Sequence, residues 1–147
     1  MTTPFGAYPG SCHCGEIGFR YHPAQPPDGW SIRACQCSFC RAHGALSTSD
    51  PAGKIEFLGA GSGALNRYRF GLHVTDFLLC RECGVYIGAV METPHGIFGI
   101  ININALRPQP TTIAGTMPME YGSESPEQRM SRRKQRWSPV VWTDSNG

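Results

Sequence analysis

The chain has 147 residues, of which 16% are charged, and a formal net charge of +2. This length suits a single domain, which we expect over residues 1–147. The small share of charged residues, together with 18 glycines and 12 prolines, favours short strands and many turns over a helical bundle. No apolar run approaches the roughly 18 residues that a membrane span needs, so we expect no membrane partner.

The first residues, Met1 to Ser11, have neither a basic start nor an apolar run, and we expect no signal peptide. The cysteine count of seven is odd, and no secretory context supports a disulfide framework. We therefore expect a cytoplasmic protein whose clustered cysteines are metal ligands or catalytic groups.

Alternating apolar residues predict short strands along most of the chain. Ile17, Phe19 and Tyr21 have the period of a strand with one buried face, and in 65–70 we expect Tyr68 and Phe70 to point inward. Residues 96–106, GIFGIININAL, are almost entirely apolar and should form a central strand. The predicted strands are 17–21, 30–34, 54–58, 65–70, 74–79, 85–91 and 96–106.

One helix is predicted, from Ser125 to Trp137, in a fold that is otherwise mainly β. Ser125 can cap this helix, Pro126 fits its first position and Glu127 lies near the positive end of its dipole. Residues 41–46 are too few to predict a helix. The remaining segments are interpreted as turns at 10–15, 47–53 and 59–63, a loop at 22–29, an irregular stretch at 111–119 and a surface segment at 138–147.

The seven cysteines fall into three close groups, and none stands alone. Thiolates repel one another and tolerate such crowding only when a cation lies between them, and Zn²⁺ is the simplest soft, tetrahedral cation to supply. An iron–sulfur cluster, which usually takes four protein ligands, and a redox C-x-x-C pair, which leaves the other thiols unexplained, are less favoured. The groups are Cys12 and Cys14; Cys35, Cys37 and Cys40; and Cys80 and Cys83.

Seven thiols divide naturally into four and three, and the spacing leaves two divisions open. A closed four-cysteine site is structural, whereas a three-cysteine site leaves a position for water or substrate. In one division, Cys37 and Cys40 join Cys80 and Cys83. In the other, which we prefer because its members are so close in sequence, the central triplet shares one ion and the outer pairs share another.

Several other residues are candidates for a site. His43, three residues after Cys40, is either a fourth ligand or a general acid/base, or a surface histidine that hydrogen-bonds a neighbouring loop. His13 is interpreted as a spacer within its C-x-C pair. Arginines can bind the carboxylate of an anionic substrate with two parallel hydrogen bonds, although each is more often simply solvated. The arginine candidates are Arg41, Arg67, Arg69 and Arg81.

Basic residues gather at 129–136, which holds five of the 13 lysines and arginines. Such a segment can meet a phosphate-rich or acidic partner, but a solvated helix face is the favoured explanation. The sequence therefore does not favour nucleic acid as a partner.

Four motifs together resemble one known family. They are GSCHCG at 10–15, CQCSFCRAHG at 35–44, CRECG at 80–84 and ININAL at 101–106. They resemble the glutathione-dependent formaldehyde-activating enzyme family, also called the centromere protein V/GFA family. The extent of the resemblance implies a core at about 10–106 and a C-terminal extension at 107–147. The resemblance implies an Mss4-like, mostly antiparallel β fold built around zinc. It also implies a structural zinc on Cys12, Cys14, Cys80 and Cys83, and a more labile catalytic zinc on Cys35, Cys37 and Cys40.

The activity that this resemblance implies is that of a carbon–sulfur lyase or synthase, which joins glutathione to formaldehyde as S-(hydroxymethyl)glutathione. An open Zn–Cys₃ position can bind a small thiol as its thiolate, which then adds to an aldehyde carbon. The catalytic candidates are Cys35, Cys37, Cys40 and His43, and the expected partner is glutathione or a related thiol. The alternatives are a non-catalytic zinc-stapled binding module and a zinc buffer or redox sensor.

Overall fold

The computed structural model describes residues 6–111 and 114–143. Residues 1–5, which belong to the segment searched for a signal peptide, lie outside the described residues. So do residues 112 and 113 of the stretch predicted to be irregular, and residues 144–147 of the predicted surface segment.

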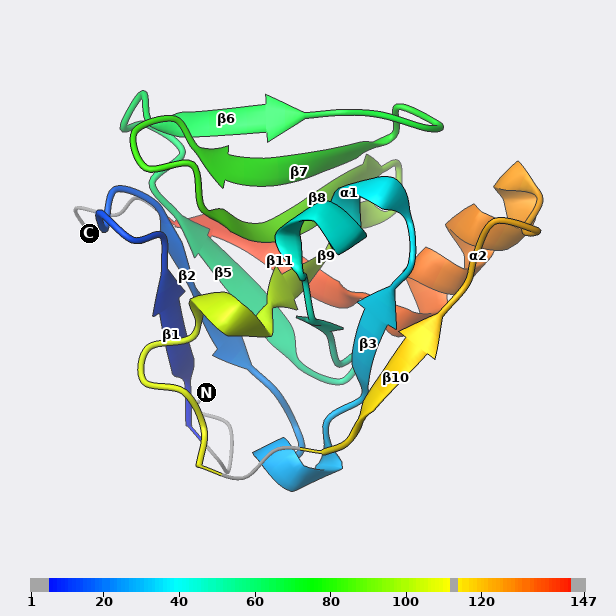
Figure 1. The fold of residues 1–147 in the computed structure, drawn as a ribbon, viewed down its shortest axis with the longest axis horizontal. Helices are drawn as coiled ribbons and strands as arrows, with labels where there is room; N and C mark the ends of the chain where they lie inside the picture. The colour runs from blue at the N-terminus through cyan, green and yellow to red at the C-terminus, as the bar shows by residue number, and fades with distance from the viewer. Residues whose placement is uncertain (1–5, 112–113, 144–147) are drawn as a thin grey trace.

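Strands are the main regular structure of the described chain and form one continuous sheet, so the fold is mainly β as predicted (Figure 1). The helices are α1 (Ser38–His43) and α2 (Pro126–Arg136), with 3₁₀ turns η1 (Pro27–Gly29) and η2 (Ile103–Ala105). The strands are β1 (Tyr8–Ser11), β2 (Gly18–His22), β3 (Ile32–Cys35), β4 (Ser47–Thr48), β5 (Lys54–Leu58), β6 (Leu65–Tyr68), β7 (Thr75–Cys80), β8 (Tyr86–Thr93), β9 (Gly96–Asn102), β10 (Thr116–Met119) and β11 (Ser138–Thr143).

Strand β9 is the branch point of the sheet. The main path runs β1-β2-β5-β11-β9-β4-β3-β10, and a second branch continues from β9 through β8 and β7 to β6. The apolar segment 96–106 is therefore central, as predicted, but its strand is shorter. It ends at Asn102, whose side chain accepts a hydrogen bond from the backbone N–H of Asn104 and so caps η2.

The core forms where alternating residues of β2 and β5 face the same side. Phe19, Tyr21, Ile55 and Phe57 are all 0% exposed, while Lys54 at the strand end is exposed. Each such side chain stabilises the fold by roughly 1.5–3 kcal/mol relative to exposure. The prediction of a strand at 54–58 is confirmed to the residue.

Two predicted non-strand segments are wrong, because both contain strands that pair with distant parts of the chain. In the stretch predicted to be irregular, β10 pairs in parallel with β3. In the predicted surface segment, β11 pairs in parallel with β5 and antiparallel with β9. Ser138 is 0% exposed and Val140 is 7% exposed, so β11 belongs to the core.

Three local predictions also differ from the structure. The segment 47–53 contains the buried strand β4. Tyr68 is 47% exposed rather than inward-facing. A short helix, α1, forms at Ser38–His43, where Cys37 caps the first turn and Gly44 ends the helix in the left-handed region at φ 58°. The predicted helix at 125–137 is confirmed as α2.

Candidate functional site

The two outer cysteine pairs come together from two separate turns. Cys12 and Cys14 lie in the turn between β1 and β2, and Cys80 and Cys83 lie at the turn between β7 and β8. The four sulfurs lie within 4.8 Å of one another. The Sγ–Sγ distances of 3.7 Å (Cys12–Cys14) and 3.5 Å (Cys14–Cys80) are close to the roughly 3.8 Å that a tetrahedral zinc with 2.3 Å bonds requires.

Backbone N–H groups surround this four-thiol group. The N–H of Ile17 lies 3.4 Å from the sulfur of Cys12, and the N–H groups of Glu82 and Cys83 lie 3.3 and 3.4 Å from that of Cys80. Gly84 closes the second turn at φ +82°, a conformation that L side chains rarely adopt. Such N–H donors stabilise negative charge on sulfur, so the residues present fit a closed metal site compatible with zinc.

The central triplet forms a second, separate thiol group. Cys35 ends β3, Cys37 is the N-cap of α1 and Cys40 lies one turn further along that helix. The three sulfurs lie within 4.8 Å of one another, and Cys37 Sγ accepts a hydrogen bond from the Cys40 backbone N–H at 3.4 Å. The sulfurs of Cys37 and Cys40 are thus grouped with Cys35 rather than with Cys80 and Cys83.

The triplet favours a thiolate at Cys35. When the three cysteines are free thiols, a hydrogen bond from Cys40 lowers the pKa of Cys35 to about 6. The same hydrogen bond and burial raise the pKa of Cys40 far above its ordinary value. Burial, with the charge of the three thiols, also raises the pKa of Tyr86. A cation is the group that would let all three sulfurs ionise together.

The triplet lies in the lining of a cavity of about 220 Å³. The four-thiol group is not part of that lining. The lining combines apolar side chains with polar ones, and we call its four arginines the arginine-rich wall. The apolar side chains are Phe70, Leu72, Val74, Phe77, Ile100 and Trp137, and the polar ones include Arg33, Ser47, Thr75, Glu120, Tyr121, Arg129, Arg132 and Arg133.

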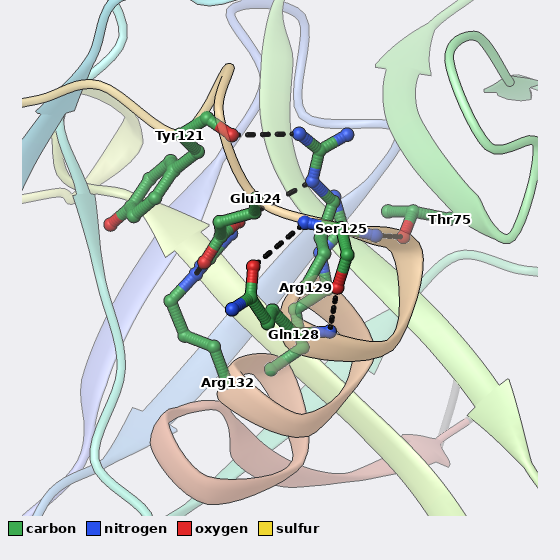
Figure 2. Close-up of polar contacts among 8 residues, drawn as sticks. Thr75, Tyr121, Glu124, Ser125, Gln128, Arg129 and Arg132 are labelled. Carbon is green, nitrogen blue, oxygen red and sulfur yellow. Dashed lines mark hydrogen bonds and ion pairs between the residues drawn. The ribbon is translucent and has the colours of Figure 1, made fainter.

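Helix α2 carries most of the arginine-rich wall, and its first turn is firmly held (Figure 2). Ser125 and Gln128 form a reciprocal capping box. Glu124 accepts hydrogen bonds from Arg129 at 3.4 Å and from Arg132 at 2.7 and 3.0 Å. The Arg132 guanidinium lies 3.6 Å from the ring centroid of Tyr121.

Arg33 and Arg133 differ from these two arginines because neither has a carboxylate partner among the described residues. Arg33 donates to Ser49 Oγ at 2.7 Å, and Arg133 donates to Thr75 Oγ1 at 2.6 Å. Burial lowers the pKa of Arg33, and burial with the nearby Arg132 lowers the pKa of Arg133 to about 10. Both guanidiniums therefore stay charged at neutral pH.

The other predicted candidates lie away from the cavity lining. Arg67 and Arg69 pair with Asp76 at 3.1 and 2.5 Å, whereas Arg41 and Arg81 are exposed. His13 is also exposed. His43 is exposed at the end of α1, with its ring 4.6 Å from that of Phe39 and 5.6 Å from that of Tyr86.

Sequence reasoning missed the arginine-rich wall, although two signals were present. Arg33 and Cys35 are two residues apart in a strand, which places both on one face. Arg129, Arg132 and Arg133 have the i, i+3, i+4 spacing of one helix face. The prediction of a solvated face is therefore wrong for these three arginines, which line the cavity.

The fold and the two thiol groups define a sheet-rich protein with cysteine clusters that could hold metal ions, one of them beside a cavity. Residues 7–117 match the family described as glutathione-dependent formaldehyde-activating enzyme, which is more than half of the chain. The chain belongs to this family, as the sequence motifs predict.

Solved structures extend this comparison to the fold. A crystal structure of a Rhodobacter sphaeroides protein has a TM-score of 0.52 and 22% sequence identity to this chain, covering 92% of this chain and 99% of that one. At this identity the likeness concerns the fold alone. No curated protein sequence matches the chain. Among the described residues, no helix has the length and apolarity of a membrane span.

Proposed function

We propose that this protein catalyses the reversible formation of a carbon–sulfur bond between a small thiol and an aldehyde. Glutathione and formaldehyde are the expected pair. The thiol sulfur bonds to the carbonyl carbon, the carbon–oxygen π bond opens, and the thiol proton ends on the former carbonyl oxygen. The product is S-(hydroxymethyl)glutathione, and no oxidant or reductant is consumed.

The observation that carries this proposal is the different placement of the two thiol groups. Cys35, Cys37 and Cys40 line the cavity, whereas the other four cysteines do not. A closed set of four thiols suits a structural ion, and a set of three beside a cavity suits a site with room for a ligand. Zinc on the triplet would supply a soft Lewis acid for a substrate sulfur at neutral pH.

The chain's own residues would bind and orient the reactants. Phe70, Phe77 and Trp137 give the cavity an apolar wall that limits water near the reacting carbon. The arginine-rich wall provides a positive field that attracts an anionic thiol. Orientation of thiol and aldehyde in one cavity raises their effective concentration, which accelerates the bimolecular step.

The test is a ¹³C exchange measurement with labelled formaldehyde and glutathione, because the uncatalysed adduct also forms. The protein should accelerate exchange between free formaldehyde and the hydroxymethyl adduct. Cys37→Ser should return exchange to the uncatalysed rate while keeping the fold, whereas Lys134→Met, on the exposed side of α2, should match the wild type. Equal acceleration by wild type and Cys37→Ser would overturn the proposal.

A further inference from the structure

The cavity beside the cysteine triplet carries more positive charge than its surroundings balance. Four guanidinium groups line it, from Arg33, Arg129, Arg132 and Arg133. Glu124 pairs with Arg129 and Arg132, and Glu120 is exposed at the lining. Neither Arg33 nor Arg133 has an ion pair among the described residues. Unpaired cations away from water cost free energy, so their presence calls for an anion.

The hydrogen bonding of Arg133 also indicates a binding site for an anion. Its Nη1 donates to Thr75 Oγ1 at 2.6 Å, but its Nε is buried and has no hydrogen-bond partner among the described residues. The guanidinium also lies 5.1 Å from the ring centroid of Trp137, which lines the same cavity. Buried donors are nearly always satisfied in native proteins, and an unused Nε–H suits a carboxylate that accepts two parallel hydrogen bonds.

The thiol triplet does not supply the missing negative charge. Three thiolates with a divalent ion carry a net charge of about −1, against two unpaired guanidiniums. A substrate thiolate bound there would bring this charge to about −2, so the case for a carboxylate is the buried Nε–H of Arg133, which has no partner among the described residues, and not the charge count.

We propose that Arg33 and Arg133 bind a carboxylate of the substrate thiol, and that these two residues set the preference of the cavity for carboxylate-bearing thiols. This inference rests on the proposed function, which places the substrate sulfur at the triplet. Arg33 lies two residues before Cys35 on β3, and Arg133 lies on α2, beyond the 7–117 segment that matches the family. The C-terminal extension thus contributes directly to substrate selection.

Binding of S-methylglutathione and of its diethyl ester, measured by calorimetry on the zinc-loaded protein, tests this subsite without turnover. The methyl group blocks the thiol, and the ester masks both carboxylates. We expect the free acid to bind at least about 10-fold more tightly than the ester, with a preference that falls as salt rises. Equal affinity for acid and ester would overturn the subsite.

Variants of the two arginines, with a lysine variant as control, test which residues bind the carboxylate. Arg133→Met and Arg33→Met should each weaken binding of the acid about 10-fold or more and leave binding of the ester unchanged. Lys134→Met removes the same charge from the exposed side of α2 and should have little effect. A loss with Lys134→Met as large as with Arg133→Met would mean that only long-range charge matters and would overturn the assignment.

The subsite and the proposed function fail in distinguishable ways. If Arg133→Met does not fold, the comparison of acid and ester on the wild type still decides the question. Selective binding of the acid without accelerated formaldehyde exchange would overturn the proposed function alone. Accelerated exchange with equal binding of acid and ester would overturn the subsite alone.

Discussion

Cys37 combines a backbone role with a place in the thiol triplet. Its sulfur accepts the Cys40 backbone N–H and caps α1, and it also lies within 4.8 Å of the other two sulfurs. Serine is among the best N-cap residues and alanine among the poor ones. Comparison of Cys37→Ser with Cys37→Ala therefore separates the cap from the thiol.

We expect both Cys37 variants to lose catalysis, and Cys37→Ala to be less stable than Cys37→Ser by about 1 kcal/mol because only serine replaces the cap. Urea unfolding of the two variants, each stripped of metal, measures this difference. Equal stabilities would contradict a capping role for the residue at position 37.

His43 can be tested by a substitution that keeps its size and polarity. Its ring is exposed and does not line the cavity, so we expect His43→Gln to lower kcat/KM by less than about 3-fold. Exchange kinetics across pH 6 to 8 would measure this. A loss of about 100-fold, with a changed pH profile, would instead assign His43 the acid/base role that its sequence position suggests.

At the scale of elements, Glu124 anchors the start of α2. The hydrogen bond from Arg132 lowers the pKa of Glu124 below its ordinary 4.5, an effect that burial partly opposes. A carboxyl group whose pKa is lower in the folded state stabilises the fold fully above its unfolded pKa, and this contribution is lost as pH falls through the folded value.

We therefore expect Glu124→Gln to be less stable than the wild type at pH 7, and the difference to shrink as pH falls from about 5 to 3. Urea unfolding at a series of pH values measures the gap. Glu127→Gln, an exposed carboxylate in the first turn of the same helix, is the matched control. A gap that stays constant with pH would contradict the pairing of Glu124 with the two arginines.

Elements with local patterns could be predicted, and elements that depend on distant partners could not. The residues of β5 alternate between buried and less buried positions, and the capping box of α2 joins residues only three positions apart, so both follow from the sequence. Strand β10 is largely exposed and contains Pro118, so it has no apolar alternation to detect. It forms because β3 offers a parallel partner, which is information outside the segment.

The same distinction applies to the candidate site. The cysteine groups are visible in the sequence because their spacing is local, and the structure brings the two outer pairs together. The arginine-rich wall depends on the position of α2 relative to β3 and β7, whose residues line the same cavity. Figure 1 shows α2 beside β10. A basic helix face has the same sequence pattern whether it is exposed to water or lines a cavity. Arg133 could therefore not be distinguished from Lys134 before the fold was known.

At the scale of the whole molecule, β11 joins the two parts of the sheet. It pairs with β5 through 140–143 and with β9 through 138–139. At this junction an added Cβ on Gly99 would lie 2.6 Å from Val140 Cγ2 and 2.7 Å from the Ala89 carbonyl oxygen. There is therefore no room for a side chain at this position.

We expect Gly99→Ala to destabilise the protein by about 1–3 kcal/mol, because the backbone must shift to admit the methyl group. Gly61→Ala, where a Cβ meets open space, should change stability by less than about 0.5 kcal/mol. Urea unfolding compares the two. Equal effects would contradict the close packing of β11 against β9.

The measurement that tests the central claim most directly is zinc K-edge X-ray absorption on the zinc-loaded protein, with and without glutathione. One group of four thiols and one of three predict an average of about 3.5 sulfur ligands per zinc, rising to about 4 when a substrate thiol binds. Cys37→Ser should abolish the rise. An average of 4 sulfurs that glutathione leaves unchanged would contradict a substrate-binding position at Cys35, Cys37 and Cys40.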